Sequence, residues 1–450
     1  MRAPSVSPAP IAAALLALLM FGCLFGAVAP AGAAAAPGKP TAKAPKGTVT
    51  STKPPFKWSK AFRATRYEVR VYKDSRPLVR KTGITTLSWK SSTALPKNVS
   101  LTWKVRARNA GGNGVWSKNL TFKVVSLYKP YFGDLHAHTA VSDGTGTQAG
   151  AYASAQAAGM DFFAVTDHSI KIGPQAWLAT QAAADAATSP TFVGVAAYEL
   201  GWQYHHHVNT FAVESIIPES ETNQANSPAV DFIDPLLAYP GAIGQFNHPT
   251  WNVGNDFDDF AGRTPERDAV MNLLEVYNWI ADNTRSSSSY VKCLDAGWHV
   301  MPTAVSDAHS VDWDTTTVPY EFRTVLLAPK LTRTDLFAAM RAHRGYATMD
   351  ENLRVDFKVD HAVMGSVITP ATRYAVSVAV TDPDTFAPGD EITKLELVSD
   401  GGAVAASRNV TGHSVTWAPT VRSSTARYFW LRVTTVDGVA AWTAPVWTGR

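Results

Sequence analysis

The sequence predicts a multidomain protein in which a central α/β domain is flanked by two all-β, sandwich-like domains. Charge is the first indication: residues 39–127 hold 20 Lys and Arg against two acidic residues, residues 131–350 carry a net charge of −15, and residues 351–450 are nearly balanced. Patterning is the second, because alternating strand patterns in the outer blocks give way to strands and Ala-rich helices in the middle. At 450 residues, the chain is also longer than one ordinary domain.

The first 36 residues are typical of a signal peptide. Arg2 precedes an apolar stretch at residues 11–28, and small residues follow around positions 33–36. We therefore expect a secreted or cell-surface bacterial protein without a transmembrane segment after cleavage, the alternative being a retained membrane anchor. Cleavage leaves Cys293 as the remaining cysteine, which excludes an internal disulfide and predicts a small buried residue.

Residues 41–127 form the basic block, with a net charge of +18 over residues 39–127. Apolar and polar residues alternate in four segments, which predicts a β-sandwich with strands at 54–59, 66–72, 85–89 and 101–107. Tyr67, Val69 and Val71 are expected to face the core, and Arg66, Glu68 and Arg70 to face outward.

This block resembles a fibronectin type III module, through Trp58, the Tyr-x-Val-x-Val strand from Tyr67 and the Trp-Lys-Val-Arg strand from Trp103. Its positive charge has two interpretations. One is a solvated surface, and the other is a tether to an anionic polymer such as a cell-wall polymer, nucleic acid or phospholipid. The block contains no specific nucleic-acid motif.

Residues 129–350 alternate between strands and helices. The pattern predicts helices at 148–160 and 175–187, strands at 161–165 and 191–198, and further helical and strand segments at 230–239, 242–246, 271–275, 286–296, 299–303 and 332–341. Polar residues of interest follow the strand ends, where α/β folds place their sites.

The most informative motif of this block is the His-x-His pair at His136 and His138. Side chains alternate along a strand, so both imidazoles point to one side, about 7 Å apart at the backbone. Imidazole is a common ligand of zinc, manganese and iron. A single His-x-His motif is a weak signal of metal binding. Acidic residues and histidines recur, however, after later strands, at Asp167-His168, Glu199, His205-His206-His207, Asn247-His248 and Asp307-Ala-His309. Together they offer ligands for two or three divalent ions.

These motifs resemble the PHP (polymerase and histidinol phosphatase) superfamily of metal-dependent hydrolases over about residues 129–350. The matching pieces are Gly-Asp-Leu-His-Ala-His-Thr from Gly133, Ser142-Asp143-Gly144, Thr166-Asp167-His168, Glu199, His207-x-Asn209, Asn247-His248-Pro249 and Ser306-Asp307-Ala-His309. The later chain, including Asp382-Pro-Asp384, is loosely similar to the branch that includes carbaryl (carbamate) hydrolase. The superfamily resemblance implies a distorted seven-stranded β/α barrel with a trinuclear metal site at its mouth.

The resemblance also implies a role for each matching position. One ion would be held by His136, His138, Glu199 and Asp307; Glu199 would bridge to a second ion held by His207 and His248; and the third would take Asp143, His168 and His309. Other members often have a histidine near Asp143. Carboxylates that orient imidazoles are expected at Asp134, Asp167 and Glu275, and phosphate clamps or ordinary surface arginines at Arg323 and Arg344.

The chemistry predicted from this set is hydrolysis of a phosphate ester by metal-bound hydroxide, with Glu199, Asp307 and His309 in the catalytic centre. Hydrolysis of a carboxyl or carbamate ester by the same site is the alternative, favoured by an aromatic mouth formed by Trp202, Tyr204, Trp251 and Trp313. A further alternative is a non-catalytic polymer-binding surface protein. The chain has no Gly-x-Ser-x-Gly motif, which argues against acyl-enzyme catalysis. Residues 351–450 again alternate as strands, and we expect them to pack against the central domain.

Overall fold

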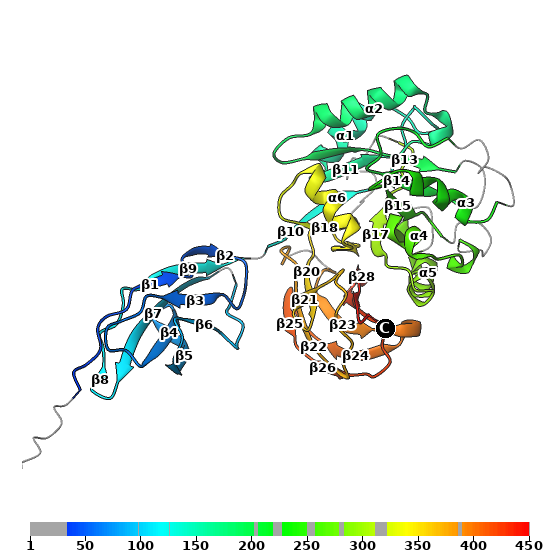
Figure 1. The fold of residues 1–450 in the computed structure, drawn as a ribbon. Coiled ribbons are helices and arrows are strands. Elements are labelled where there is room, and N and C mark those ends of the chain that lie inside the picture. Colours follow the sequence, from blue (N-terminus) through cyan, green and yellow to red (C-terminus); the bar gives the residue numbers. More distant parts are fainter. Residues whose placement is uncertain are drawn as a thin grey trace, which may run out of the picture. The chain divides into compact units, whose positions relative to one another are not determined.

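The computed structural model describes residues 34–97, 99–125, 127–201, 206–218, 227–249, 257–278, 283–310, 322–385 and 389–449 (Figure 1). Two compact units divide the chain, Met1–Ser126 and Leu127–Arg450. The predicted signal peptide lies outside the described residues, except for its last three positions. In the part of the chain that the structure describes, no helix is long and apolar enough to cross a membrane.

The first unit is a β-sandwich. Its strands form one three-stranded sheet in the order β1 (Ala42–Ala44), β3 (Pro55–Trp58), β6 (Ser88–Lys90), and a second sheet in the order β2 (Gly47–Val49), β9 (Leu120–Val124), β7 (Ser100–Asn109), β4 (Arg66–Lys73), β5 (Arg76–Ile84), with β8 (Gly112–Asn113) beside β7. The sheets share an aromatic core that includes Phe56, Trp58, Trp103 and Phe122. Sequence alternation predicts this arrangement because Val69 and Val71 point into that core.

The second unit is also mostly β. Its largest sheet has the order β12 (Val193–Ala196), β11 (Phe162–Val165), β10 (Lys129–Asp134), β18 (Arg323–Ala328), β19 (Gly345–Thr348), β28 (Gly438–Thr443), β27 (Tyr428–Thr435), β23 (Ile392–Val398), β24 (Val404–Asn409), with β29 (Val446–Trp447) paired to β27. A second sheet has the order β13 (Tyr198–Leu200), β14 (Val208–Phe211), β15 (Ile243–Phe246), β16 (Met271–Asn278), β17 (Met301–Val305).

Helices pack against the strands of these two sheets that precede residue 350 (Figure 1). The main ones are α1 (Gln148–Ala157), α2 (Pro174–Ala187), α5 (Asn283–Asp295) and α6 (Arg333–Arg341); shorter helical segments are α3 (Val230–Ile233), η2 (Asp234–Ala238) and α4 (Pro265–Val270). Thr147, Thr264 and Thr332 cap α1, α4 and α6 with their hydroxyl groups. Cys293 of α5 is buried, as predicted.

The seven-stranded barrel implied by the resemblance is not what the hydrogen-bonded ladders form. Among the described residues, isolated bridges join the two sheets at Ala137–Ala308 and His168–Glu199. Between β17 and β18, a side chain makes hydrogen bonds that backbone groups make in a regular sheet. The Thr324 hydroxyl group donates to the Ala304 carbonyl and accepts from the Ala304 amide. A seam therefore runs between the sheets, and it passes beside several of the predicted metal ligands.

The region after residue 350 continues the central sheet across the expected domain boundary. Tyr346 to Thr348 of β19 pair antiparallel with Ala441 to Thr443 of β28. A further sheet of β20 (Arg354–Val359), β21 (Ala362–Val363), β22 (Arg373–Thr381), β25 (Ser414–Trp417) and β26 (Thr420–Arg422) packs over this extension. The expectation that the last hundred residues pack against the central domain is met through one continuous sheet and a shared core.

Gly133 shows why the first motif begins with glycine. It lies in β10 where that strand pairs with Phe162 of β11, and a Cβ at this position would overlap the Phe162 carbonyl and ring. The close approach of the two strands brings the ends of β10 and β11 together. The motif histidines and Asp167-His168 consequently lie at one edge of the sheet.

Candidate metal centre

The nine predicted ligand residues come from six strand ends and meet over the seam between the sheets. His136 and His138 follow β10, His168 follows β11, Glu199 lies in β13, His207 precedes β14, His248 follows β15, and Asp307 and His309 follow β17. Asp143 reaches the group from the loop after His138. Each of the nine has a nitrogen or oxygen atom within 4.0 Å of another member.

His136 and His138 form the centre of the first group. Their Nε2 atoms lie 3.1 Å apart, and each is 3.2 Å from Asp307 Oδ1. Glu199 closes the group, with Oε1 3.4 Å from His136 Nε2 and Oε2 3.3 Å from His138 Nε2. Two imidazole lone pairs that face each other at this distance repel, so a proton or a cation must lie between them.

Glu199 also links the first group to a second. Its Oε1 lies 3.1 Å from His207 Nδ1 and 3.3 Å from His248 Nε2, and its Oε2 lies 3.2 Å from His168 Nδ1. The carboxylate is 1% exposed and accepts a hydrogen bond from the Asn247 side chain at 2.7 Å. Glu199 thus lies between the two groups, and its role as a bridging ligand stays a prediction.

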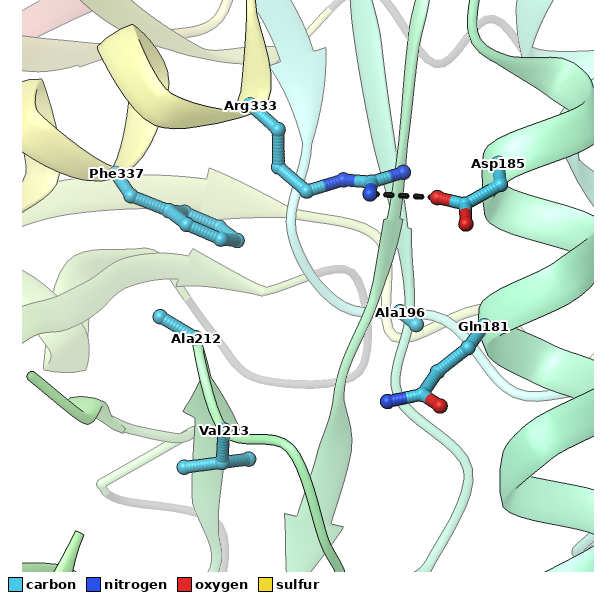
Figure 2. Close-up of a pocket in the computed structure, with 7 residues that line it drawn as sticks. All are labelled: Gln181, Asp185, Ala196, Ala212, Val213, Arg333 and Phe337. Atoms are coloured by element: carbon cyan, nitrogen blue, oxygen red, sulfur yellow. Dashed lines mark hydrogen bonds and ion pairs between the residues drawn. The ribbon is translucent and has the colours of Figure 1, made fainter.

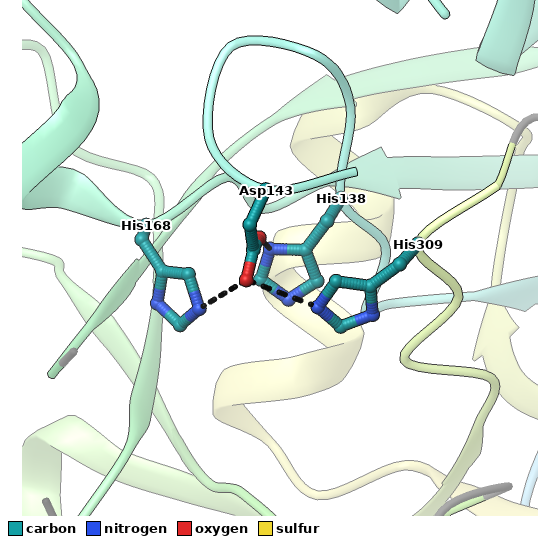
Figure 3. A group of neighbouring side chains, drawn as sticks. All are labelled: His138, Asp143, His168 and His309. Atoms are coloured by element: carbon teal, nitrogen blue, oxygen red, sulfur yellow. Dashed lines mark ion pairs between the residues drawn. The ribbon is translucent and has the colours of Figure 1, made fainter. Parts of the chain in front are cut away.

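Asp143 lies among three imidazoles in the third group (Figure 3). Its Oδ2 is 3.4 Å from His309 Nε2 and 3.7 Å from His168 Nε2, and its Oδ1 is 3.5 Å from His138 Nδ1. His168 Nδ1 lies 2.8 Å from the Gly201 carbonyl, to which it donates, and this leaves Nε2 as the nitrogen that can ligate a metal.

The centre has a buried floor and a more open rim. His136, His138 and Glu199 are at most 1% exposed. The side chains of Asp143 and His309 are 34% and 36% exposed. Among the described residues, a substrate would therefore reach the centre from the side of Asp143 and His309.

Glu275 is the carboxylate that orients an imidazole. Its Oε1 accepts from His136 Nδ1 at 2.8 Å, so His136 Nε2 faces the centre. Glu275 also accepts from the His248 amide at 2.6 Å and from Gln245 and Asn278. These bonds fix both histidines relative to each other.

Asp134 and Asp167 were also predicted to orient imidazoles, and for them the prediction is wrong. Asp134 accepts from the amides of His136 and Ser306, at 3.1 Å each. Asp167 accepts from Thr139 and Ser142, through backbone amides and hydroxyl groups. Both carboxylates therefore hold the loops that carry the histidines, because the strand-end turns present amide groups to them.

Two of the predicted ligands have strained backbones. His248 has φ +26° and Asp307 has φ +53°, a region that non-glycine residues rarely adopt. Such conformations cost about 1–3 kcal/mol and persist where surrounding contacts enforce them. Here the His248 amide is held by Glu275, and the Asp307 amide donates to the His136 carbonyl at 3.0 Å.

The electrostatics of the centre favour bound positive charge. Burial opposes protonation of His136 and His138, but Asp307 and Glu199 outweigh it, so the pKa of His136 is raised well above its usual value and that of His138 to about 9. Burial likewise opposes ionisation of Glu199, yet the surrounding histidines hold its pKa well below the usual range. Burial, with His138 and His207 nearby, lowers the pKa of His168 to about 4 despite Glu199.

The two arginines proposed as phosphate clamps differ in position. Arg344 donates to the carbonyls of Leu327 and Ala338 and stacks on Tyr128, with its guanidinium carbon 4.6 Å from the ring centroid. It lies at the start of β19, beside the end of β18 that is remote from the centre. Arg323 is buried and donates to the Phe322 carbonyl. Arg344 is thus a structural residue.

A cleft elsewhere on the second unit contains none of the predicted ligands. It is lined by Gln181, Asp185, Ala196, Ala212, Val213, Arg333 and Phe337 (Figure 2). Arg333 is engaged there by Asp185 at 2.7 Å and by the Gly194 carbonyl. The cleft lacks the cluster of histidines and carboxylates that metal chemistry needs, so we place the functional site at the seam.

Some predictions fall outside the described residues, namely His205 and the aromatic mouth of Trp202, Tyr204, Trp251 and Trp313. His206 is described, and its ring packs against Phe257 at 5.1 Å. Asn247 and Asn278 were not predicted as site residues, although Asn247 holds Glu199 and Asn278 donates to Asp307 at 3.3 Å. Asn247 belongs to the Asn247-His248-Pro249 motif, whereas the signal for Asn278 is its position at a strand end.

Comparison with known proteins gives neighbours in structure only. No protein-family model and no curated protein matches the chain. Among solved structures, a two-domain protein from Bacteroides vulgatus containing a predicted PHP-like metal-dependent phosphoesterase is 16% identical, with coverage of 71% of this chain and 96% of that chain and a TM-score of 0.38. An amidohydrolase from Chromobacterium violaceum with bound sulfate is 15% identical, with coverage of 40% and 87% and a TM-score of 0.27.

A Fn3-like protein from Clostridium thermocellum is 19% identical, with coverage of 20% of this chain and 94% of that chain and a TM-score of 0.17. At these identities and TM-scores, the comparisons assign neither a family nor an activity. The chemistry of the centre therefore has to be derived from its own residues.

Proposed function

We propose that the second unit is a metal-dependent hydrolase that cleaves a phosphate ester at the centre described above. The observation that carries this proposal is the set of three overlapping groups of potential ligands: His136, His138 and Glu199; His168, Glu199 and His207; and His138, Asp143, His168 and His309. Within each group the ligand atoms lie within 4.8 Å of one another. Shared members indicate a multinuclear centre of two or three ions.

The donor set fits divalent zinc, manganese or iron. It consists of imidazole nitrogens and carboxylate oxygens, which these ions accept in mixed sites. Three carboxylates, Glu199, Asp307 and Asp143, converge with six imidazoles, and buried carboxylates need compensating positive charge. When bound, such ions would supply Lewis acidity and a nucleophilic water at neutral pH.

The chain's own residues orient the reactants. Glu275 and the Gly201 carbonyl set the ring orientations of His136 and His168, so that Nε2 of each faces the centre. His309 Nδ1 donates to the Asp307 carbonyl at 2.9 Å, which leaves Nε2 at the open rim. There the Nε2 lone pair can ligate an ion beside Asp143 or, once protonated, pass that proton to the departing alcohol, while Asp307 and Glu199 hold the floor.

The proposal is tested by metal analysis and a substrate panel on the full chain. We expect two or three divalent ions per chain by mass spectrometry, and turnover of p-nitrophenyl phosphate or bis(p-nitrophenyl) phosphate. The His136→Ala/His248→Ala double variant should lose both. His361→Ala is the matched control, because His361 is exposed on the turn between β20 and β21.

Other substrates in the same panel separate the alternatives. Turnover of naphthyl methylcarbamate or a carboxyl ester, with no turnover of either phosphate, would replace phosphate hydrolysis by ester or carbamate hydrolysis at the same centre. Metal binding without turnover of any of these substrates would contradict the phosphoesterase assignment. A protein that binds no metal after reconstitution would favour the non-catalytic, polymer-binding alternative.

We also propose that the first unit attaches the exported protein to an anionic polymer. Supporting this is one face of its larger sheet, here called the basic face: Arg66, Arg70, Arg80, Lys104, Arg106 and Arg108. Five of them alternate with the core positions on β4 and β7, and Arg80 lies on β5 beside Arg70. Glu68 is the acidic residue among them. Trp116 lies against this face, with the Arg106 guanidinium 4.5 Å from its ring centroid.

Co-sedimentation with wall polymer tests this attachment. Binding should weaken steeply between about 50 and 200 mM salt, because phosphate contacts release counterions. Lys104→Glu/Arg108→Glu should reduce binding and leave turnover unchanged, whereas Lys358→Glu, in the second unit, serves as the control. Binding that is insensitive to both salt and Lys104→Glu/Arg108→Glu would contradict the proposal.

A further inference from the structure

Apart from the histidine centre, the second unit contains a group of acidic residues, here called the aspartate cluster: Asp350, Asp382 and Asp390. One carboxylate oxygen of each lies within 4.8 Å of those of the other two. Asp350 follows β19, Asp382 follows β22, and Asp390 precedes β23. The cluster therefore lies where the central sheet joins the sheets of the last hundred residues.

Asp382 is the buried member, and its carboxylate is incompletely bonded. The residue is 1% exposed. Its Oδ1 accepts from the Asp384 amide at 2.8 Å, whereas its Oδ2 is buried without a hydrogen-bond partner among the described residues. A buried carboxylate oxygen with no donor is costly, and a cation would satisfy it.

A second buried oxygen without a hydrogen-bond partner belongs to Asn352. The Asn352 amide donates to Asp350 Oδ1 at 2.7 Å, and its side-chain nitrogen donates to Asp384 Oδ2 at 2.5 Å. These two bonds place the Asn352 amide group between the loops that carry Asp350 and Asp382. Its Oδ1 is then available as a neutral oxygen ligand beside the cluster.

Negative charge accumulates around these oxygens. Burial raises the pKa of Asp382, and together with the charges of Asp350, Asp390 and Asp384 it brings that pKa to about 6. Asp437 and Asp384 also act on Asp390, whose pKa is raised by burial and by these carboxylates and is lowered by His413.

Backbone hydrogen bonds hold the segments in place. The Asp382 amide donates to the His413 carbonyl at 2.8 Å, and the Asp437 amide donates to the Gly389 carbonyl at 3.3 Å. Gly389 has φ +99°, and a Cβ at this position would overlap the Asp437 carboxylate. The geometry is thus set by the surrounding strands and turns rather than by the carboxylates themselves.

From the convergence of three carboxylates, the two orphaned buried oxygens and the fixed loops, we propose that the aspartate cluster binds one Ca²⁺ ion. Oxygen ligands from loops of unequal geometry suit Ca²⁺, which accepts six to eight ligands flexibly, better than Mg²⁺, which needs near-octahedral geometry. The absence of imidazole nitrogens from its ligand set distinguishes this site from the histidine centre. The ion would fasten the end of β19 to the loops around β22 and β23.

The test is calorimetric titration of CaCl₂ into the full chain reconstituted with Zn²⁺ and then freed of unbound metal, so that the histidine centre is filled and does not contribute. We expect one Ca²⁺ per chain with a Kd of about 10⁻⁵–10⁻³ M, and weaker binding of MgCl₂. In thermal unfolding, saturating Ca²⁺ should raise the Tm by at least about 3 °C. Asp382→Asn and Asp390→Asn should each remove both effects, because they keep the shape of the side chain and remove its charge.

Asp356→Asn is the matched control, since Asp356 is an exposed aspartate on β20 of the same region. It should keep the full response to Ca²⁺. In EGTA, Asp390→Asn should be at least as stable as the parent protein, because it removes like-charge repulsion; this shows that the variant folds. The proposal is overturned if the parent protein shows no Ca²⁺ binding, or if Asp390→Asn retains the same Ca²⁺ response.

Discussion

Glu68 in the first unit and Glu199 in the second are both buried carboxylates surrounded by nitrogen atoms, but their partners differ in kind. Glu68 is bound by arginines, with Arg70 and Arg80 at 2.9 Å and Arg106 at 2.7 Å. Glu199 is surrounded by imidazoles at 3.1–3.4 Å. Arginine is permanently charged, so the Glu68 network is complete in itself. Imidazole can exchange its proton for a metal ion, so the Glu199 network can bind metal ions in place of protons.

This difference shows why buried charge alone does not identify a site. Glu68 contributes to the stability of a β-sandwich surface, whereas Glu199 holds groups whose charge depends on pH and on bound metal. Variants at the two glutamates should therefore separate stability from activity.

The largest effect is expected for Glu199→Gln. The amide cannot supply the negative charge shared by the groups around it, so kcat/KM should fall by about 10³ or more, with loss of bound metal. Steady-state kinetics and metal analysis measure both. Glu68→Gln should leave kcat/KM unchanged, and a similar loss in the two variants would remove the distinction between the networks.

Metal affinity should rise strongly with pH. In the metal-free protein, His138 has a raised pKa of about 9 and His136 and His248 are also raised, so metal binding displaces protons. Each displaced proton gives about a tenfold change in affinity per pH unit, so between pH 6 and 8 we expect an increase of about 100-fold or more. Competition titration with a chelating dye measures it. A flat profile would mean that these histidines are neutral before metal binds.

A smaller loss is expected for Glu275→Gln, which weakens the orientation of His136 without removing a ligand. Metal affinity or kcat should fall about 10–100-fold, as for other residues that position metal ligands. Asp335→Asn, at a half-buried aspartate in the first turn of α6, provides the comparison. If Glu275→Gln lowered kcat/KM and metal content as much as Glu199→Gln, Glu275 would have to contact the metal or substrate directly.

In the first unit, Glu68→Gln should lower the free energy of unfolding by about 1–3 kcal/mol, because it removes the buried negative charge that Arg70, Arg80 and Arg106 share. Chemical denaturation of the full chain, followed by the fluorescence change of the first transition, measures this loss. Glu214→Gln, at a half-exposed glutamate of the second unit, should change it little.

The two networks should also respond to pH in opposite directions in metal-free protein. The arginines overcome burial and hold the pKa of Glu68 at about 2, below its usual 4.5, so its contribution is present above pH 4.5 and is lost as pH falls toward 2. His138 has a raised pKa, so its contribution is present below pH 6.5 and is lost as pH rises through about 9. Thermal unfolding from pH 3 to 9.5 measures both contributions. As the pH rises, we expect the unfolding temperature of the first unit to increase at the acidic end and that of the second unit to decrease at the basic end.

Sequence patterns predicted individual elements well where one face is apolar. Helix α2 and strands β11, β15 and β17 lie within two residues of the expected segments. Strand β5 was missed because Arg76–Ile84 is exposed on both faces and has no apolar alternation; its pairing with β4 makes it a strand. The pairing of β19 with β28 was also unpredictable, because its partners are far apart in sequence.

Site residues were predictable where they belong to short sequence motifs, and not where they come from segments far apart in the sequence. The histidines and acids at strand ends carry short motifs, so all nine could be named, although their role as ligands stays a prediction. Glu68 was expected to face solvent, and the alternation was correct, but the long side chains of Arg70, Arg80 and Arg106 bury it. The aspartate cluster draws on separate segments, so no local motif could reveal it.

The most direct test of the central claim is the metal content of the purified full chain after reconstitution with Zn²⁺ or Mn²⁺, measured alongside turnover of bis(p-nitrophenyl) phosphate and p-nitrophenyl phosphate. The account predicts two or three ions per chain and a release of p-nitrophenol that Glu199→Gln abolishes and Glu68→Gln preserves. Less than one ion per chain, or equal turnover by the parent protein and Glu199→Gln, would contradict it.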